Sequence, residues 1–320
     1  MQLVCRWVAL AAATLCSVVL SPCAQAEAKV RIVVSVDWEG RDLAPANLAA
    51  IQQFRSDFDD IPLQHFLNAA YYTKPDANQG EVTRAITSVL RKGDEHGLHL
   101  HGWMRLFEAA GVSFRTGPTY LKDPVDLRSC RHDCGHEVAI TAYREDELRR
   151  VIRFASDTLE GQGFDRPHSF RAGGWQADAK VLRALAREGF TVDSSATHAK
   201  FLEPAWGGTN LYTFVRQLWA SVVPTTQPYV VDLGGGDRIT ELVNNGCLAD
   251  YMTGKAMLEV FRGNAAALGQ VPDRDVYVSI GFHQETAAKY LPALRDGITR
   301  IKEYGTKRGI PFEFIVDPVF

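Results

Sequence analysis

The sequence predicts an α/β protein in which helices cover a sheet of mostly parallel strands. Short apolar runs alternate with longer amphipathic segments almost to the end of the chain, which is typical of repeated β–α units. No Gly-x-Gly-x-x-Gly pattern follows the first apolar run, so a dinucleotide-binding fold is disfavoured. We therefore expect a parallel sheet, open or closed, and favour a barrel.

The elements follow one another in a regular order. Residues 31–37 and 276–283 are apolar runs rich in β-branched residues, as expected for buried strands. The segment 144–160 begins with three acidic residues, which the positive end of a helix dipole stabilises. The expected strands are residues 31–37, 63–71, 97–103, 169–174, 190–195, 229–233, 238–243, 276–283 and 312–316. The expected helices are residues 44–58, 81–96, 144–160, 178–188, 251–268 and 285–304.

Two long irregular stretches interrupt this alternation, at about 104–138 and 197–228. Neither has the composition of a linker or a low-complexity tract. Long segments of this kind are typical of active-site walls, so we expect a single catalytic domain over residues 27–320.

Residues 1–26 are expected to form a secretory signal peptide. The start carries one positive charge, residues 7–20 are apolar or small, and Ala24-Gln25-Ala26 offers a small-residue cleavage site. The apolar stretch is too short for a stable membrane anchor. We therefore expect an exported protein, either periplasmic or secreted.

The charge balance argues against a nucleic-acid partner. The formal net charge is −3 at pH 7, with 35 Lys and Arg against 38 Asp and Glu, and no basic run stands out. The sequence makes no prediction of the oligomeric state.

Three cysteines remain after removal of residues 1–26, and two of them lie close together. In an oxidising compartment Cys130 and Cys134 are the natural disulfide pair, which leaves Cys247 unpaired. Cys130, His132, Cys134 and His136 alternate along the chain and offer a second interpretation, a zinc site. The disulfide is the simpler interpretation for a long loop of an exported protein.

Two carboxylates stand at the end of the first expected strand. Asp37 and Glu39 are two positions apart, so they share one face of the strand, whereas Trp38 points the other way. Two converging acids repel each other unless a metal ion or a proton lies between them. The pair therefore predicts a cation nearby.

The third expected strand carries a pair of histidines with the same spacing. His99 and His101 share a strand face, an arrangement that presents two imidazoles to one metal ion. One carboxylate and two histidines would leave open positions for water and substrate. The alternative is two partly exposed histidines without a ligand role.

Other polar residues lie at the ends of later strands. Arg171, before Gly173-Gly174-Trp175, either pairs with a carboxylate or binds an anion; the alternative is a surface arginine. Asp193 could orient a histidine or could cap a turn. His283 ends the strand 276–283, where a general acid could stand.

In this order the motifs resemble those of the polysaccharide deacetylase family, the metal-dependent carbohydrate esterases that include nodulation-type chitooligosaccharide deacetylases. The resemblance extends from about residue 30 to residue 318. It implies a distorted (β/α)7 TIM-like barrel that removes N- or O-acetyl groups from a carbohydrate. It also implies one divalent metal ion, with zinc as the expected ion.

The resemblance also implies roles for the metal-site residues. Asp37 would be the base that activates the metal-bound water, and Glu39 would be a ligand in place of the aspartate most members use. His99 matches the first metal histidine. The family's His-x-x-x-His spacing would put the second at Trp103, which cannot bind a metal, so His101 is expected to replace it.

The remaining roles concern proton transfer and the substrate. Arg171 would orient Asp37, and Asp193 would tune His283, the acid that protonates the leaving group. Trp175 would wall the acyl pocket, and Trp103 is expected to border the substrate. Two alternatives stay open: a related deformylase or amidohydrolase acting on a small substrate, and a non-catalytic sugar-binding protein on the same barrel.

Overall fold

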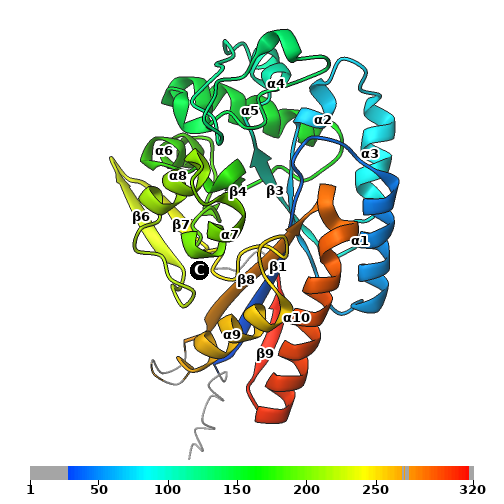
Figure 1. Ribbon diagram of the computed structural model, residues 1–320, viewed down its shortest axis with the longest axis vertical. Coiled ribbons are helices and arrows are strands. Elements are labelled where there is room, and N and C mark those ends of the chain that lie inside the picture. The colour runs from blue at the N-terminus through cyan, green and yellow to red at the C-terminus, as the bar shows by residue number, and fades with distance from the viewer. Residues whose placement is uncertain (1–27, 269, 271–273, 317–320) are drawn as a thin grey trace, which may run out of the picture.

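The computed structural model describes residues 28–268, 270 and 274–316. The expected signal peptide lies outside the described residues. A curved sheet runs through the middle of the molecule and helices cover its outside (Figure 1). The strands are β1 Val30–Asp37, β2 Gln64–Leu67, β3 Glu95–Leu100, β4 Ser169–Ala172, β5 Val192–Asp193, β6 Tyr229–Gly234, β7 Asp237–Glu241, β8 Val276–His283 and β9 Phe312–Ile315. The helices are α1 Pro45–Asp57, α2 Ala70–Thr73, α3 Gln79–Thr87, α4 Met104–Ala109, α5 Glu145–Gly161, α6 Ala179–Arg187, α7 Glu203–Trp206, α8 Asn210–Leu218, α9 Gly254–Ala265 and α10 Ala287–Arg308.

The strand order is β6-β7-β5-β4-β3-β2-β1-β8, and neighbours are parallel except for the antiparallel hairpin of β6 and β7. β1 is the second-last strand of this order and pairs along its whole length with β8, the last strand. On its other edge the first half of β1 pairs with β9 and the second half with β2. β1 is almost entirely buried, as its β-branched sequence predicts.

The sheet closes into a distorted barrel through the segment that follows β7. The Gly246 N–H donates to the Ser279 carbonyl (2.9 Å), and the Ala249 N–H donates to the Gly281 carbonyl (2.7 Å). These bonds join the segment to β8, so β1, β2, β3, β4, β5, β7 and β8 surround one interior. The predicted (β/α)7 TIM-like barrel is confirmed. It is distorted because β5 has only two residues and closure depends on an irregular segment.

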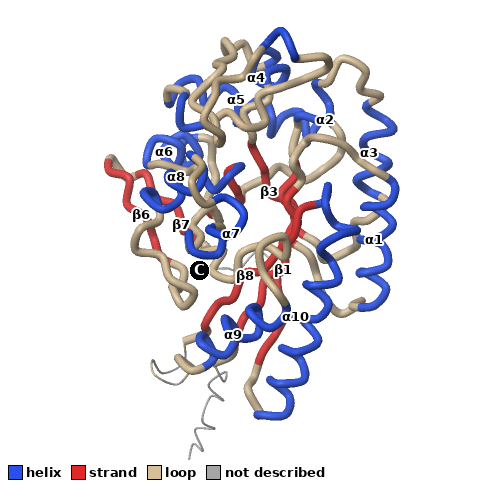
Figure 2. Tube along the Cα trace, in the orientation of Figure 1, coloured by secondary structure: helices blue, strands red, loops and turns tan. Residues whose placement is uncertain are grey.

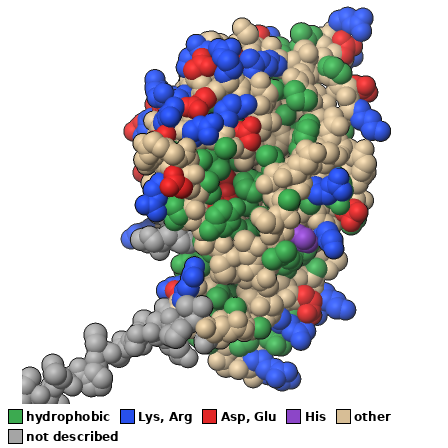
Figure 3. Space-filling view, turned by 90° about the vertical axis from the view of Figure 1, so that its left-hand side faces the viewer, with side chains coloured by type: hydrophobic (Ala, Val, Ile, Leu, Met, Phe, Trp, Pro, Cys, Tyr) green, Lys and Arg blue, Asp and Glu red, His purple; other side chains and the backbone are tan. Residues whose placement is uncertain are grey.

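Helices pack on the outside of this sheet, as the alternation of the sequence predicts. α10 packs against α1 and α9, and α9 and α10 cover β8, whereas α5 and α6 lie on the other side of the molecule (Figures 1 and 2). Acidic and basic side chains are intermixed on the face of Figure 3. Ion pairs of this kind join α5 to α6, for example Arg183 with Glu145 (3.2 Å) and Arg149 with Glu188 (2.7 Å).

Several expected elements have different bounds. The strand expected at 63–71 ends at Leu67, and α2 follows it. The helix expected at 81–96 ends at Thr87, because Asp94 accepts the Arg91 N–H (2.8 Å) in a turn that leads directly into β3. α4, α7 and α8 lie in the two stretches that were expected to be irregular. Within the described residues, no helix is long and apolar enough to cross a membrane.

Candidate active site

Titratable side chains gather where the parallel strands of the barrel end. Asp37 is the last residue of β1 and pairs in register with His283, the last residue of β8. His99 near the end of β3 pairs in register with Arg171 of β4. Glu39 lies two residues beyond β1. The carboxyl-terminal end of a β/α barrel is where its catalytic side chains usually lie.

The carboxylate of Glu39 lies among four imidazoles. Its Oε1 is 3.3 Å from Nε2 of His99 and 3.3 Å from Nε2 of His283. Its Oε2 is 3.2 Å from Nε2 of His101 and is in contact with Nε2 of His136. Burial alone would raise the pKa of Glu39, but His101, His283 and His136 hold it well below its ordinary value.

Two of these histidines present a lone pair to Glu39. Nδ1 of His99 is 2.8 Å from the Arg171 carbonyl oxygen, and Nδ1 of His101 is 2.8 Å from the His136 carbonyl oxygen. A carbonyl only accepts, so both Nδ1 atoms carry a proton, and in the neutral ring Nε2 is then left without one. Nε2 of His101 is buried and has no hydrogen-bond partner, although it faces a carboxylate oxygen.

This arrangement fits a divalent cation. Two buried lone pairs that face each other at 3.2 Å need a proton or a cation between them. Two ligand atoms that share an ion at about 2.1 Å are roughly 3.0–3.4 Å apart, as these atoms are. Burial lowers the pKa of His101, which keeps its imidazole in the neutral form that binds metals.

His136 comes from the loop that the disulfide closes. The expected disulfide between Cys130 and Cys134 is present, and Cys247 is free and buried. The His136 ring stacks on that of His101, with 3.8 Å between centroids and 14° between planes. Ligand atoms of Glu39, His101 and His136 all lie within 4.8 Å of one another. His136 is thus a potential ligand that the sequence prediction omitted, although the alternation from Cys130 to His136 pointed to it.

Arg171 is in contact with Asp37, as expected. Its Nη1 donates to Oδ1 of Asp37 (2.7 Å) and to the Ser35 hydroxyl (2.7 Å). Its Nε and Nη2 donate to the carbonyl (2.9 Å) and the hydroxyl (2.8 Å) of Ser194. Arg171 and Asp37 are both almost completely buried, so the guanidinium holds the carboxylate in one orientation.

Asp250 orients His283, so the expectation that Asp193 does so is wrong. Oδ1 of Asp250 is 3.1 Å from Nδ1 of His283, and Oδ2 accepts the His283 N–H (3.3 Å). Burial acts to lower the pKa of His283, but the charges of Asp250 and Glu39 outweigh it and raise this pKa to about 10. Asp250 follows the irregular segment that closes the barrel, where no sequence pattern marks it.

Asp193 instead belongs to a buried carboxyl pair. It is the register partner of Glu241 on β7, and both side chains are fully buried. Burial and the negative charge of Asp193 raise the pKa of Glu241 well above its ordinary value. The Ser195 hydroxyl donates to Asp193 (2.7 Å). Asp193 therefore has a structural place on β5, away from His283.

The two tryptophans have different places. Trp175 lines the cavity beside the site, as expected, and its indole N–H donates to Asn244 (3.2 Å). Trp103 is buried, does not line this cavity and donates its indole N–H to the Glu39 carbonyl (2.8 Å). Trp103 directly precedes α4 and packs behind the chain that carries Glu39, so it lies outside the lining of this cavity, and its expected place beside the substrate stays a prediction.

A cavity of about 750 Å³ opens onto Glu39, His101, His136 and His283. Much of its wall is aromatic, and these side chains are Tyr120, Trp175, Trp206, Tyr251 and Tyr290. Glu285 also lines it and accepts the backbone N–H groups of Glu39 (3.1 Å) and Arg41 (3.3 Å). Burial and the negative charge of Glu39 raise the pKa of Glu285 to about 7. Sequence reasoning missed Glu285, although it stands two residues after His283.

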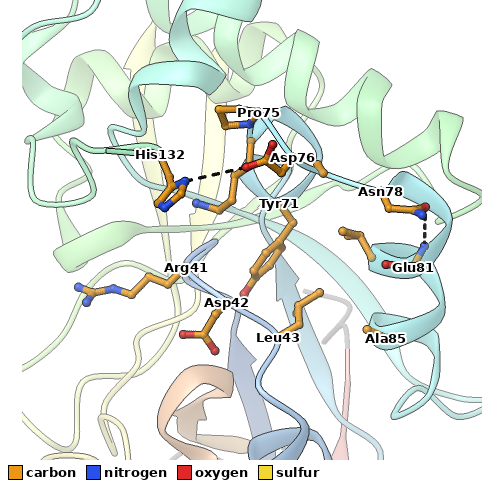
Figure 4. Close-up of a pocket in the computed structure, with 13 residues that line it drawn as sticks. Arg41, Asp42, Leu43, Tyr71, Pro75, Asp76, Asn78, Glu81, Ala85 and His132 are labelled. Carbon is orange, nitrogen blue, oxygen red and sulfur yellow. Dashed lines mark hydrogen bonds and ion pairs between the residues drawn. The ribbon is translucent and has the colours of Figure 1, made fainter. Parts of the chain in front are cut away.

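A second cavity of about 400 Å³ adjoins the first, and both are lined by Arg41 and Asp42 (Figure 4). The ring of Tyr71 lines the second cavity, and its hydroxyl donates to Glu285 in the wall of the first. In Figure 4, Arg41 extends to the side opposite Glu81. Arg41 thus stands between the two cavities.

Comparison with known proteins gives matches in structure only. No model of a protein family matches the sequence, and no curated protein matches it. A proposed glycoside hydrolase/deacetylase from Parabacteroides distasonis is similar in structure, with a TM-score of 0.50 and 12% identity over 91% of this chain and 69% of that chain. This chain shares its fold.

Two further solved structures have lower scores. A proposed polysaccharide deacetylase from Mycobacterium smegmatis has a TM-score of 0.49 and 14% identity over 92% of this chain and 96% of that chain. The PuuE allantoinase has a TM-score of 0.47 and 14% identity over 90% of this chain and 87% of that chain. At these identities the likeness concerns the fold, and the chemistry must be argued from the site itself.

Proposed function

We propose that this protein is a metal-dependent hydrolase that removes acetyl groups, N- or O-linked, from a carbohydrate. The observation that carries the proposal is the unpartnered Nε2 of His101, which is buried 3.2 Å from the Glu39 carboxylate among three further imidazoles. The fold shared with a protein described as a proposed glycoside hydrolase/deacetylase supports the proposal. The motif resemblance to the polysaccharide deacetylases points to the same chemistry.

Glu39, His99 and His101 would hold the ion. Two imidazoles and one carboxylate make a donor set suited to zinc and leave room for water and substrate. A bound divalent cation supplies Lewis acidity to the acyl carbonyl and lowers the pKa of a water it binds from ~16 to ~7.

The protein's own residues would then move the protons. Asp37, which Arg171 holds in place, accepts the proton of the attacking water. His283 has a pKa raised to about 10, so it is protonated at neutral pH and can donate to the leaving nitrogen or oxygen. Asp250 fixes the ring of His283 and favours the charged form.

The cavity wall is suited to a sugar. Aromatic side chains offer flat apolar faces, and Asp42, Glu137 and Asp250 offer hydrogen-bond acceptors at the same cavity. Trp175 would wall the acyl group next to the ion.

We further propose that the chain is exported after removal of residues 1–26, which mass spectrometry of the mature N-terminus would test.

Metal analysis and acetate release from acetylated chitooligosaccharides test this function in purified protein. The unaltered protein is expected to contain about one zinc ion and to release acetate. Asp37→Asn is expected to keep the zinc and lose at least about 100-fold in kcat, which is the usual contribution of a general base. His101→Ala is expected to lose zinc and activity together.

His132→Ala is the matched control, because His132 is an exposed histidine of the same loop as His136. It is expected to keep both zinc and activity. Unaltered protein that binds no divalent ion would refute the proposal. Zinc binding without acetate release would leave the alternatives: formate or ring-amide hydrolysis on a small substrate, or sugar binding without turnover.

A further inference from the structure

Arg41 makes a contact that the proposed chemistry does not use. Its Nη2 is 2.8 Å from Nδ1 of His136, whose Nε2 is in contact with Oε2 of Glu39. Arg41 is itself exposed and lines both cavities. The Arg41 side chain therefore extends from the cavity wall to the buried ring of His136.

This contact decides which nitrogen of His136 carries the proton. A guanidinium has only donors, so Nδ1 of His136 must accept, and in a neutral ring the proton then lies on Nε2. An Nδ1 that accepts this bond carries no proton, so the ring is neutral. Nε2–H therefore donates to Glu39 and has no lone pair to offer a cation.

His99 and His101 are in the opposite tautomer. Their Nδ1 atoms donate to backbone carbonyls, so their Nε2 lone pairs are available. His136 differs from them in this contact, although ligand atoms of His136, Glu39 and His101 all lie within 4.8 Å of one another.

We propose that Arg41 is a positioning residue that keeps His136 out of the ligand set, so that Glu39, His99 and His101 alone hold the ion. The inference rests on the proposed metal-dependent function and deepens it. Without Arg41, the ring can carry its proton on Nδ1 and offer Nε2 as a fourth ligand. Four protein ligands are typical of closed structural zinc sites, whereas three leave a position for water. Arg41 thus keeps the site at three protein ligands, as in catalytic zinc sites, and prevents the four-ligand arrangement of a structural site.

Zinc affinity and the number of bound imidazoles test the proposal. Affinity is measured by competition with a chromogenic chelator, and imidazoles are counted by X-ray absorption at the zinc edge. Arg41→Met removes the donor at an exposed position and is expected to raise the count from two to three. The dissociation constant is expected to fall about 10- to 100-fold, which is the size of effect that outer residues have on zinc sites.

Three further variants distinguish an effect through the His136 tautomer from an effect of the positive charge of Arg41. Arg41→Lys keeps a donor without an acceptor and is expected to retain two imidazoles. Lys74→Met removes another positive charge from the wall of the second cavity without touching His136, and is expected to change the affinity less than about threefold. In a His136→Ala background, Arg41→Met is also expected to change the affinity less than about threefold.

The outcomes are distinct. Three imidazoles in the unaltered protein, or two in a folded Arg41→Met variant, would overturn the role of Arg41 and leave the hydrolase function standing. An equal gain in affinity from Arg41→Met with and without His136 would also overturn it, because charge alone would then explain the effect. Absence of zinc binding in the unaltered protein would instead refute the proposed function.

Discussion

The substitution Gly173→Ala tests the metal site through its closest neighbour. Gly173 follows β4, and a methyl group on its Cα would lie 2.5 Å from Cε1, Nδ1 and Nε2 of His101. Ordinary contact begins at 3.4 Å, so the ring would have to move by the difference, about 0.9 Å. It cannot recede freely, because its other face stacks on His136 at 3.8 Å.

A shift of this size is large for a metal ligand. Ligand distances in metal sites hold to within about 0.2 Å, so a ring displaced by about 0.9 Å no longer binds the ion. We expect the zinc dissociation constant of Gly173→Ala to rise at least about 100-fold, equivalent to about 2.8 kcal/mol. Overpacking should also lower the free energy of unfolding by about 1–3 kcal/mol.

Chelator competition measures the zinc affinity, and urea unfolding shows that the variant is folded. Gly161→Ala is the matched control, because an added Cβ at this last residue of α5 meets no atom within 4 Å. It is expected to keep the zinc affinity and to gain about 0.5–1 kcal/mol in stability. A folded Gly173→Ala protein with unchanged zinc affinity would refute the placement of His101 as a ligand.

Further predictions concern proton transfer, stability and the ion. Asp250→Asn is expected to lower kcat for acetate release about 100-fold at unchanged zinc content, because His283 loses its charged partner; unchanged kcat would contradict this role. Asp94→Asn breaks the buried ion pair with Arg55 (2.8 Å) and is expected to cost about 3–5 kcal/mol in urea unfolding at pH 7. Although burial acts to raise it, His65 and backbone N–H groups lower the pKa of Asp94 to about 2. The ionised Asp94 carboxylate therefore contributes fully to the free energy of unfolding above about pH 4–5, and this contribution is lost as the pH falls through 2. The difference in free energy of unfolding between the unaltered protein and Asp94→Asn should narrow by about 2 kcal/mol between pH 6 and pH 2. A difference that stays constant would show that the pKa of Asp94 is not lowered. Chelator treatment is expected to abolish acetate release and added zinc to restore it, whereas activity that survives complete metal removal would exclude the metal-dependent mechanism.

Residues on regular strands could be predicted from the sequence because strand geometry fixes their direction. Asp37 and His99 lie on β1 and β3, near the strand ends. Glu39 and His101 follow them by two residues, just beyond these strands, at the same end of the barrel. The direction of Arg171 could be predicted in the same way, because Arg171 on β4 pairs in register with His99 on β3. The α/β alternation likewise predicted a mostly parallel sheet covered by helices, open or closed, and the resemblance to the polysaccharide deacetylases implied the barrel.

Residues on loops could not be predicted in this way. His136 enters the site from the loop closed by Cys130 and Cys134, and Asp250 enters from the segment that closes the barrel. Neither residue lies in a helix or strand whose periodicity would fix the direction of its side chain. For Asp193, the predicted place at the end of β5 was right, but the predicted partner was wrong. Its partner is Glu241, which comes from a strand 48 residues later in the chain.

The sequence by itself determined the fold class and which side chains stand at the strand ends, because both depend on local periodicity. The tertiary structure decided which of these side chains meet and in what chemical form. It placed Asp250 on His283, moved Trp103 beneath Glu39, and brought the exposed Arg41 to Nδ1 of His136. The physical reason is that a proton's position depends on the donors and acceptors that surround it, and these come from distant parts of the chain.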